Sequence, residues 1–275
     1  MCRPRTATAA GRRSAGDRTG ERLSVSSDVP TAMYGDRGRI GLIVPSSSTT
    51  NEPEFAGALP SGVSLHAARM RLDGVDADSL SAMVDDVERC ADLLATADVD
   101  VVAYGRTTGS LVHGPGYDEE IEARIEEAAG VPAVATAASA KRAFDALDAD
   151  SLAVTTPYVD DLNEREAAFL DAAAGYDVVA MRGLGIGSNT DIGAQTPETA
   201  ADAACEADDP EADAVFVSCT NYRTFEMVAD AERDLGKPVV TSDQATLWDA
   251  LGHLDAEVTP TSALGRLFDR SPPSA

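Results

Sequence analysis

The sequence predicts an α/β fold of two similar halves, each with a four-stranded parallel sheet flanked by helices. Short apolar runs alternate along the chain with segments of helical periodicity, which is typical of parallel sheets covered by helices on both faces. The pattern repeats. Apolar runs at Ile43 and Val154 lie 111 residues apart, and Arg106 and Cys219 follow two further runs at a spacing of 113. A ligand site is expected where the carboxyl ends of the two sheets face each other.

The eight expected strands are short apolar runs, the first of which ends at Pro45. They are expected at 39–44, 63–67, 99–104, 131–136, 152–155, 178–181, 214–217 and 238–241. The longest helix is predicted over 79–96 because apolar residues recur there at helical spacing: Leu80, Met83, Val84, Val87, Ala91 and Leu94. A helix that contains Ile121 and Ile125 ends at Gly130. Further helices are expected at 140–147, 163–174, 197–206, 224–235 and 243–251.

The chain divides into an extension and two lobes. Residues 1–32 hold six arginines, many small polar residues, and neither apolar periodicity nor the apolar run of a secretory signal. We expect them to be a disordered N-terminal extension, with Met33 as an alternative start. The first lobe is expected to comprise 33–137 plus 242–275, and the second lobe 138–241.

The charge excludes several classes of partner. Asp and Glu number 47 against 22 Lys and Arg, and the net charge is −25. Such a negative field argues against nucleic acid and anionic membranes as binding partners. No apolar stretch approaches the roughly 20 residues of a membrane span. Acidic residues are spread over the whole chain, which has only two lysines. This composition predicts a halophilic, cytoplasmic protein, because concentrated salt would screen the repulsion among the acidic side chains. The four cysteines lack metal or disulfide spacing and are expected to be free thiols.

Cys219 is the strongest catalytic candidate from the residues alone. It follows an apolar strand within the segment 218–221 and precedes an expected helix. A thiol at a helix N-terminus should have a lowered pKa, so that it could transfer a proton or attack a carbon. The amides of Thr220 and Asn221 could bind an anion there. The alternative is a small buried core residue.

Hydroxyl groups follow several other strands. They belong to Ser46, Ser47, Ser48, Thr107, Thr108 and Ser110. Hydroxyls and amides suit a carboxylate or an enediolate, although each residue singly also fits an ordinary loop. Tyr158 and Asn189 follow strands of the second half, and a phenol there could bind a substrate carboxylate or simply pack.

The sequence predicts neither a metal nor an organic cofactor. The glycine-rich segment 183–189 lacks the third glycine of a dinucleotide fingerprint, because Thr190 stands in its place. His66, His113 and His253 are scattered and form no metal-ligand pattern. Cys90 and Cys205 lie in helical segments as core or near-core residues.

Three segments together resemble a known family. They are 39–49, the first strand with its serine turn; 156–165, which begins Thr156-Pro157-Tyr158; and 218–224, which contains Ser218-Cys219-Thr220-Asn221. They resemble the maleate isomerase and arylmalonate decarboxylase family of the aspartate/glutamate racemase superfamily, over about 39–251. The resemblance implies two Rossmann-like lobes related by a pseudo-two-fold, a site between them, and cofactor-independent chemistry at the carbon beside a carboxylate.

The resemblance also implies roles for single residues. Cys219 matches the catalytic cysteine of the second half. The substrate-binding set is Ser47, Ser48, Thr107, Thr108, Tyr158, Asn189, Thr220 and Asn221. Two positions depart from the family: racemases and maleate isomerases have a cysteine at Arg106, and the isomerases have an asparagine at Ser48. A guanidinium at position 106 could hold a carboxylate, turn outward, or form a surface ion pair.

The expected function is that of an enzyme acting on a small dicarboxylate without a cofactor. A single cysteine favours decarboxylation through an enediolate with protonation from one face. Maleate cis-trans isomerisation is the alternative, favoured by the residues around Cys219 and by Asn189. A third possibility is a dicarboxylate-binding protein without catalysis. A homo-oligomer is possible, and the sequence does not predict the oligomeric state.

Overall fold

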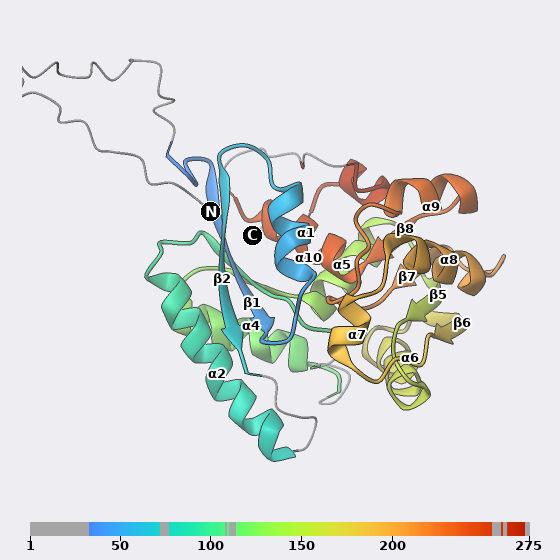
Figure 1. Cartoon of the computed structure of the whole chain (residues 1–275), viewed down its shortest axis with the longest axis horizontal. Helices are drawn as coiled ribbons and strands as arrows, with labels where there is room; N and C mark the ends of the chain where they lie inside the picture. The colour runs from blue at the N-terminus through green and yellow to red at the C-terminus, as the bar shows by residue number, and fades with distance from the viewer. Residues whose placement is uncertain are drawn as a thin grey trace, which may run out of the picture. The chain divides into compact units, whose positions relative to one another are not determined.

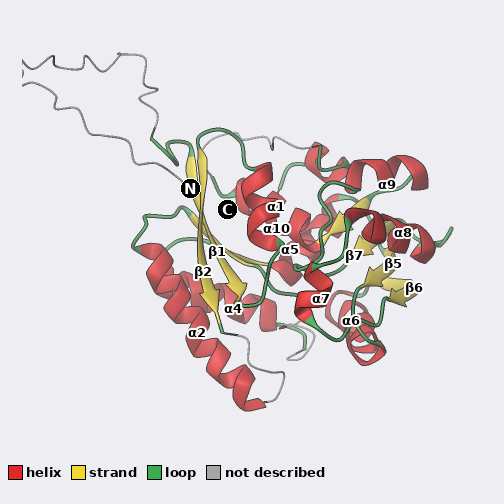
Figure 2. Cartoon of the chain, viewed as in Figure 1, coloured by secondary structure: helices red, strands yellow, loops and turns green. Residues whose placement is uncertain are grey.

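The computed structural model describes residues 33–71, 77–107, 109, 114–254, 260 and 263–272. The predicted extension 1–32 lies outside the described residues, as do Thr108, Ser110 and His113. Two separate sheets, each flanked by helices, make up the fold (Figure 1, Figure 2). None of the helices in the described part of the chain is long and apolar enough to cross a membrane.

The first sheet has the strand order β2-β1-β3-β4, with all neighbours parallel. Its strands are β1 (Gly38–Pro45), β2 (Val63–Met70), β3 (Val101–Tyr104) and β4 (Ala133–Ala135). The second sheet repeats this order as β6-β5-β7-β8, again parallel throughout. Its strands are β5 (Ser151–Thr156), β6 (Asp177–Gly183), β7 (Ala214–Val217) and β8 (Val239–Thr241). The predicted fold class is therefore confirmed.

Helices connect the strands on both faces of each sheet. In chain order they are α1 (Asn51–Ala58), α2 (Ala77–Ala95), α4 (Tyr117–Ala129), α5 (Thr136–Ala146), α6 (Asp160–Ala174), α7 (Asn189–Gly193), α8 (Pro197–Ala207), α9 (Val228–Leu235), α10 (Ser242–Gly252) and the 3₁₀ helix η1 (Arg266–Asp269). The sequence did not predict α1 and α7, which are short, and α9 begins four residues later than predicted.

Each sheet separates two apolar clusters, as the alternation of side chains along a strand requires. In β1, Ile43 faces the cluster formed with α2 and α4, whereas Leu42 faces the cluster formed with α1 and α10. In the second sheet, Phe216 packs with α5 and α6, and Val215 packs with α8. The cores therefore lie on both faces of both sheets.

The helices α5 and α10 join the two halves and lie between the sheets in Figure 1. Phe144 of α5, which follows the first sheet, packs against the second, and Leu247 of α10, which follows the second sheet, packs against the first. The two helices also contact each other through polar groups, because the Ser139 hydroxyl donates to Asp249 Oδ2 at 2.7 Å. The lobe boundaries at 137/138 and 241/242 remain predictions.

Candidate active site

The strand order brings four loops to one region. In each sheet the second strand lies on one side of the first strand and the third strand lies on its other side. Ligand sites of open α/β sheets lie at such switch points, beside the carboxyl ends of the strands. The loops concerned are 46–50 after β1, 105–107 after β3, 157–159 after β5 and 218–221 after β7. Hydrogen bonds between the halves hold these loops together.

Three predicted substrate-binding residues form one network across the two halves. The Asn189 side-chain amide donates to Ser47 Oγ at 2.8 Å, and the Asn221 side-chain amide donates to the Asn189 carbonyl at 2.6 Å. Asn221 Oδ1 accepts from the Thr49 amide at 2.8 Å. Asn189 reaches this position because Ser188 caps the N-terminus of α7. Ser47, Asn189 and Asn221 are thus brought together, and Ser48 is buried in the same loop as Ser47.

Cys219 is buried, and three groups surround it. Its amide donates to Ser242 Oγ at 3.0 Å, and its sulfur accepts from the Asn221 amide at 3.3 Å. The Tyr158 hydroxyl hydrogen-bonds the thiol. Burial raises the pKa of Cys219 to about 12, although Tyr158 and the Asn221 amide both favour the thiolate.

The expected lowering of the Cys219 pKa by a helix N-terminus is therefore wrong. The helix α9 begins only at Val228, so Cys219 does not lie at its N-terminus. A turn at Thr220 and Asn221 follows the cysteine instead, and desolvation outweighs the single amide that contacts the sulfur. At neutral pH the group is consequently a thiol that holds its proton.

Ser242, the first residue of α10, was missed by the sequence analysis. Its hydroxyl accepts from the Cys219 amide and lies 3.2 Å from Thr107 Oγ1, so it joins two predicted site residues. Thr220 Oγ1 donates to the Gly105 carbonyl at 3.2 Å and connects the same two loops. Gly105 has no room for a side chain, since a Cβ there would lie 2.5 Å from Asn51 Nδ2.

Arg106 is buried, at 4% exposure, so its side chain does not turn outward to solvent. Its positive charge acts electrostatically on the hydroxyls of Tyr104, Tyr117 and Tyr158. Its positive charge favours the ionised form of each phenol, although burial keeps the pKa of all three phenols raised. Because Tyr158 contacts the Cys219 thiol, Arg106 faces the region between the two halves.

Buried carboxyls near the loops were also missed. Glu166 of α6 acts on both Cys219 and Tyr158, and burial raises its pKa to about 7. The Ser218 hydroxyl is the neighbour that favours its charged form. Glu166 and Asn163 share the buried face of α6 with Phe169, at helical spacing. This polar pair on an apolar face was a sequence pattern that could have revealed them.

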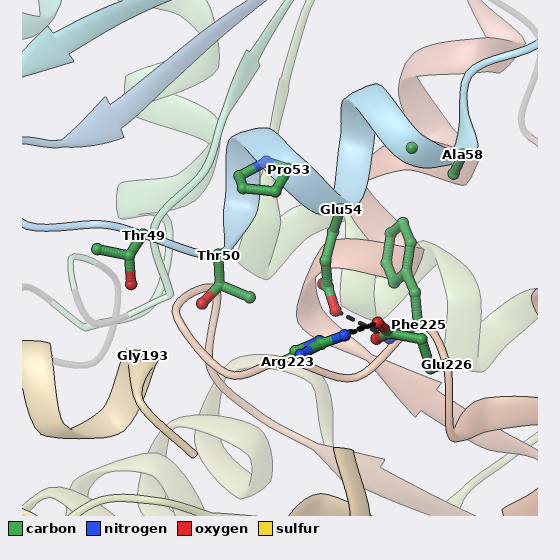
Figure 3. A pocket seen from close by; sticks show the side chains of 10 residues that line it. Thr49, Thr50, Pro53, Glu54, Ala58, Gly193, Arg223, Phe225 and Glu226 are labelled. Carbon is green, nitrogen blue, oxygen red and sulfur yellow. Dashed lines mark hydrogen bonds and ion pairs between the residues drawn. The ribbon is translucent and has the colours of Figure 1, made fainter. Parts of the chain in front are cut away.

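A cavity of about 420 Å³ adjoins the Asn221 network (Figure 3). It lies between α1, α7 and the loop before α9, and Arg223 pairs with Glu226 beside it. Its lining residues are Thr49, Thr50, Pro53, Glu54, Gly57, Ala58, Gly193, Arg223, Phe225 and Glu226.

The other described cysteines lie elsewhere in the fold. Cys90 belongs to the core cluster beneath α2 and α4, and Cys205 is exposed on α8. Within the residues that the structure describes, no group of three His, Cys, Asp or Glu side chains could hold a metal ion. The groups at and beside the loops are a thiol, phenols, hydroxyls, amides, buried carboxyls and one buried guanidinium.

Comparisons with known proteins show the family of the chain. The arylmalonate decarboxylase family model matches residues 40–268. A maleate isomerase of Nocardia farcinica is 34% identical over 240 residues, covering 84% of this chain and 95% of the relative. The arylmalonate decarboxylase of Bordetella bronchiseptica is 29% identical over 234 residues, covering 84% of this chain and 97% of its own.

Two solved structures extend the likeness to three dimensions. A cysteine-to-alanine variant of the maleate isomerase Iso from Pseudomonas putida S16, crystallised with maleate, has a TM-score of 0.78 and 27% identity, covering 84% of this chain and 97% of that one. A cysteine-to-serine variant of the Nocardia farcinica enzyme, with a covalently bound succinylcysteine intermediate, has a TM-score of 0.77 and 32% identity, covering 84% and 98%. The chain belongs to the arylmalonate decarboxylase family, whose members include decarboxylases and maleate isomerases.

Proposed function

We propose that this protein is a cofactor-independent decarboxylase of a small dicarboxylic acid, with Cys219 as the proton donor. One observation carries the proposal: of the thiols that the structure describes, Cys219 alone lies at the strand ends, and the corresponding loop of the other half carries the buried Arg106. A single thiol can protonate a carbon from one face only. Two opposed thiols, as racemisation requires, do not occur among the described residues.

The reaction proceeds in two steps. The bond between the α-carbon and one carboxylate breaks, carbon dioxide leaves, and the electron pair spreads onto the remaining carboxylate as an enediolate. The Cys219 S–H bond then breaks as its proton forms the new C–H bond, and the resulting thiolate takes a proton from water. No cofactor is needed, because the remaining carboxylate accepts the electron pair. The raised pKa of Cys219 supports this role, since it keeps the proton on sulfur until a stronger base forms.

The surrounding groups bind the two carboxylates. Arg106 suits the retained carboxylate, because a guanidinium donates two parallel hydrogen bonds to it. Hydroxyls and amides then stabilise the enediolate oxygens as charge develops on them. We assign these contacts to Ser47, Ser48, Thr107, Thr108, Tyr158, Asn189, Thr220 and Asn221.

Maleate isomerisation is the second candidate, favoured by the 34% identity with a maleate isomerase. A thiolate would add to the double bond, rotation would follow, and the same C–S bond would break. The resemblance gives that attack to a first-half cysteine, and Arg106 stands at its position in this chain. The pKa of Cys219 is raised, so Cys219 would rarely be a thiolate at neutral pH in its place. A dicarboxylate-binding protein without turnover is the third candidate.

Proton NMR in D₂O distinguishes the three. The full chain is offered maleate, methylmalonate, phenylmalonate, aspartate and glutamate in concentrated salt, which screens the acidic surface. The proposal predicts a deuterated monoacid from a malonate, with the signal lost in Cys219→Ser. Fumarate from maleate would identify an isomerase instead. Binding of a dicarboxylate without any product would favour the third candidate.

A further inference from the structure

Two carboxyl groups are buried side by side behind the Cys219 loop. Glu54 lies on α1 and Asp243 in the first turn of α10; their exposed fractions are 8% and 0%. A side-chain hydrogen bond joins them. Two carboxylates at hydrogen-bond distance repel each other unless a proton lies between them, as in other buried acid pairs.

Glu54 contacts the Cys219 loop, which we define as residues 218–227, and the neighbour of Asp243 contacts it at a second point. Glu54 Oε1 accepts from the Thr224 amide at 2.5 Å and from the Phe225 amide at 2.9 Å. At the second point, Cys219 donates to Ser242, the residue that precedes Asp243. Glu54 belongs to the first half of the chain and the loop to the second, so these bonds cross between the halves.

Asp243 is itself held in place by a neighbour. Its Oδ1 accepts from Asn51 Nδ2 at 3.0 Å, and Asn51 begins the helix that carries Glu54. The geometry assigns the proton to Asp243, which donates to Glu54, because Glu54 already accepts two backbone amides. Glu54 is then the carboxylate of the pair, and the proton gives a partner to Asp243 Oδ2, which has no other hydrogen bond among the described residues.

We propose that Glu54 and Asp243 share one proton and act as positioning residues that fasten the Cys219 loop to the first half of the molecule. Loss of the proton places two negative charges together in the interior, and their repulsion drives Glu54 away from the Thr224 and Phe225 amides. The effect on turnover rests on the proposed function, whereas the effect on the loop does not.

The electrostatic surroundings support one retained proton. Burial raises the pKa of Glu54 to about 7 and that of Asp243 well above its ordinary value. Glu226 on the Cys219 loop raises the Glu54 pKa further. Arg223, on the same loop, feels the charge of Glu54 but pairs with Glu226. Glu54 lines the 420 Å³ cavity, which gives the pair a route for proton exchange (Figure 3).

The first experiment measures the loop without any substrate. Hydrogen–deuterium exchange of peptides covering 218–227 and the rate of Cys219 alkylation are compared in wild type, Glu54→Ala and Glu54→Gln. Glu54→Ala leaves two amides unpaired, and we expect both rates to rise about tenfold or more. Glu54→Gln keeps an acceptor for the amides and a donor for Asp243, so it should remain within about threefold of wild type.

Glu52→Ala is the matched control, because Glu52 lies on the same helix but pairs with Arg69 at the surface. It should leave both rates unchanged. Unchanged rates in Glu54→Ala would overturn the proposal, and so would a Glu54→Gln variant as labile as Glu54→Ala. If Glu54→Ala does not fold, the infrared measurement below still decides.

Infrared spectroscopy tests the shared proton directly. At about pH 8.5 the wild type should show the carbonyl band of a protonated carboxylic acid, and Asp243→Asn should lose it. Glu166→Gln should retain the band, because Glu166 is ionised above its pKa of about 7. A band that survives in Asp243→Asn, or that is absent from wild type, would overturn the assignment. Neither result depends on whether the enzyme is a decarboxylase.

Discussion

Replacing Glu166 by glutamine should change the pH dependence of stability by a predictable amount. Burial raises the pKa of Glu166 from 4.5 to about 7 in the folded chain. Folding therefore favours the protonated form, so the stability from this group is complete below about pH 4.5 and is lost as the pH rises through 7. At 1.36 kcal/mol per pKa unit the shift corresponds to about 3 kcal/mol. About 2.5 kcal/mol of this falls between pH 5 and 8.

The assay is urea unfolding of wild type and Glu166→Gln between about pH 5 and pH 8 in one salt concentration. The free energy of unfolding of the variant should rise relative to wild type by about 2.5 kcal/mol across that range. Any cost of burying the amide is the same at every pH and does not alter the slope. Glu164→Gln, an exposed neighbour on α6, should show no such slope. A difference between wild type and Glu166→Gln that stays constant with pH would refute the reasoning.

Three further changes have expected outcomes. Ser242→Ala removes the acceptor of the Cys219 amide, so urea unfolding should show a loss of about 1–3 kcal/mol. Tyr158→Phe removes the hydroxyl that favours the Cys219 thiolate, so the pH profile of thiol alkylation should move to higher pH; an unchanged profile would contradict the contact. The Phe144 ring lies 5.1 Å, between ring centroids, from each of Tyr176 and Phe216. Phe144→Ala leaves a cavity there and should lower the free energy of unfolding by about 3–5 kcal/mol, measured by thermal or urea unfolding.

The strands could be predicted because buried parallel strands are continuous apolar runs. The strand expected at 214–217 coincides with β7, and the repeat of apolar runs predicted the two four-stranded sheets. The start of α9 could not be predicted in this way. The amides of Thr224 and Phe225 bond Glu54, far away in the sequence, rather than an adjacent helical turn. Local periodicity contains no information about such a partner.

At the site, too, the residues that follow a local sequence pattern could be predicted, and those that depend on distant contacts could not. Tyr158, Asn189 and Asn221 follow strands, so the rule for strand ends and the resemblance to the family both selected them. Ser242 and Asp243 begin α10, which packs from the second sheet onto the first and is buried along almost its whole length. Its polar residues therefore serve the site only through the tertiary arrangement. The roles assigned to Cys219 and the binding residues remain predictions until they are tested.

The most direct test of the account is the stereochemistry of protonation. The full chain is given a prochiral disubstituted malonate in D₂O, and the monoacid product is analysed for deuterium and for enantiomeric composition, with Cys219→Ser as the control. The account predicts one deuterium at the α-carbon, a single enantiomer, and no product from Cys219→Ser. A racemic product, or turnover that persists without Cys219, would contradict proton delivery by one thiol from one face.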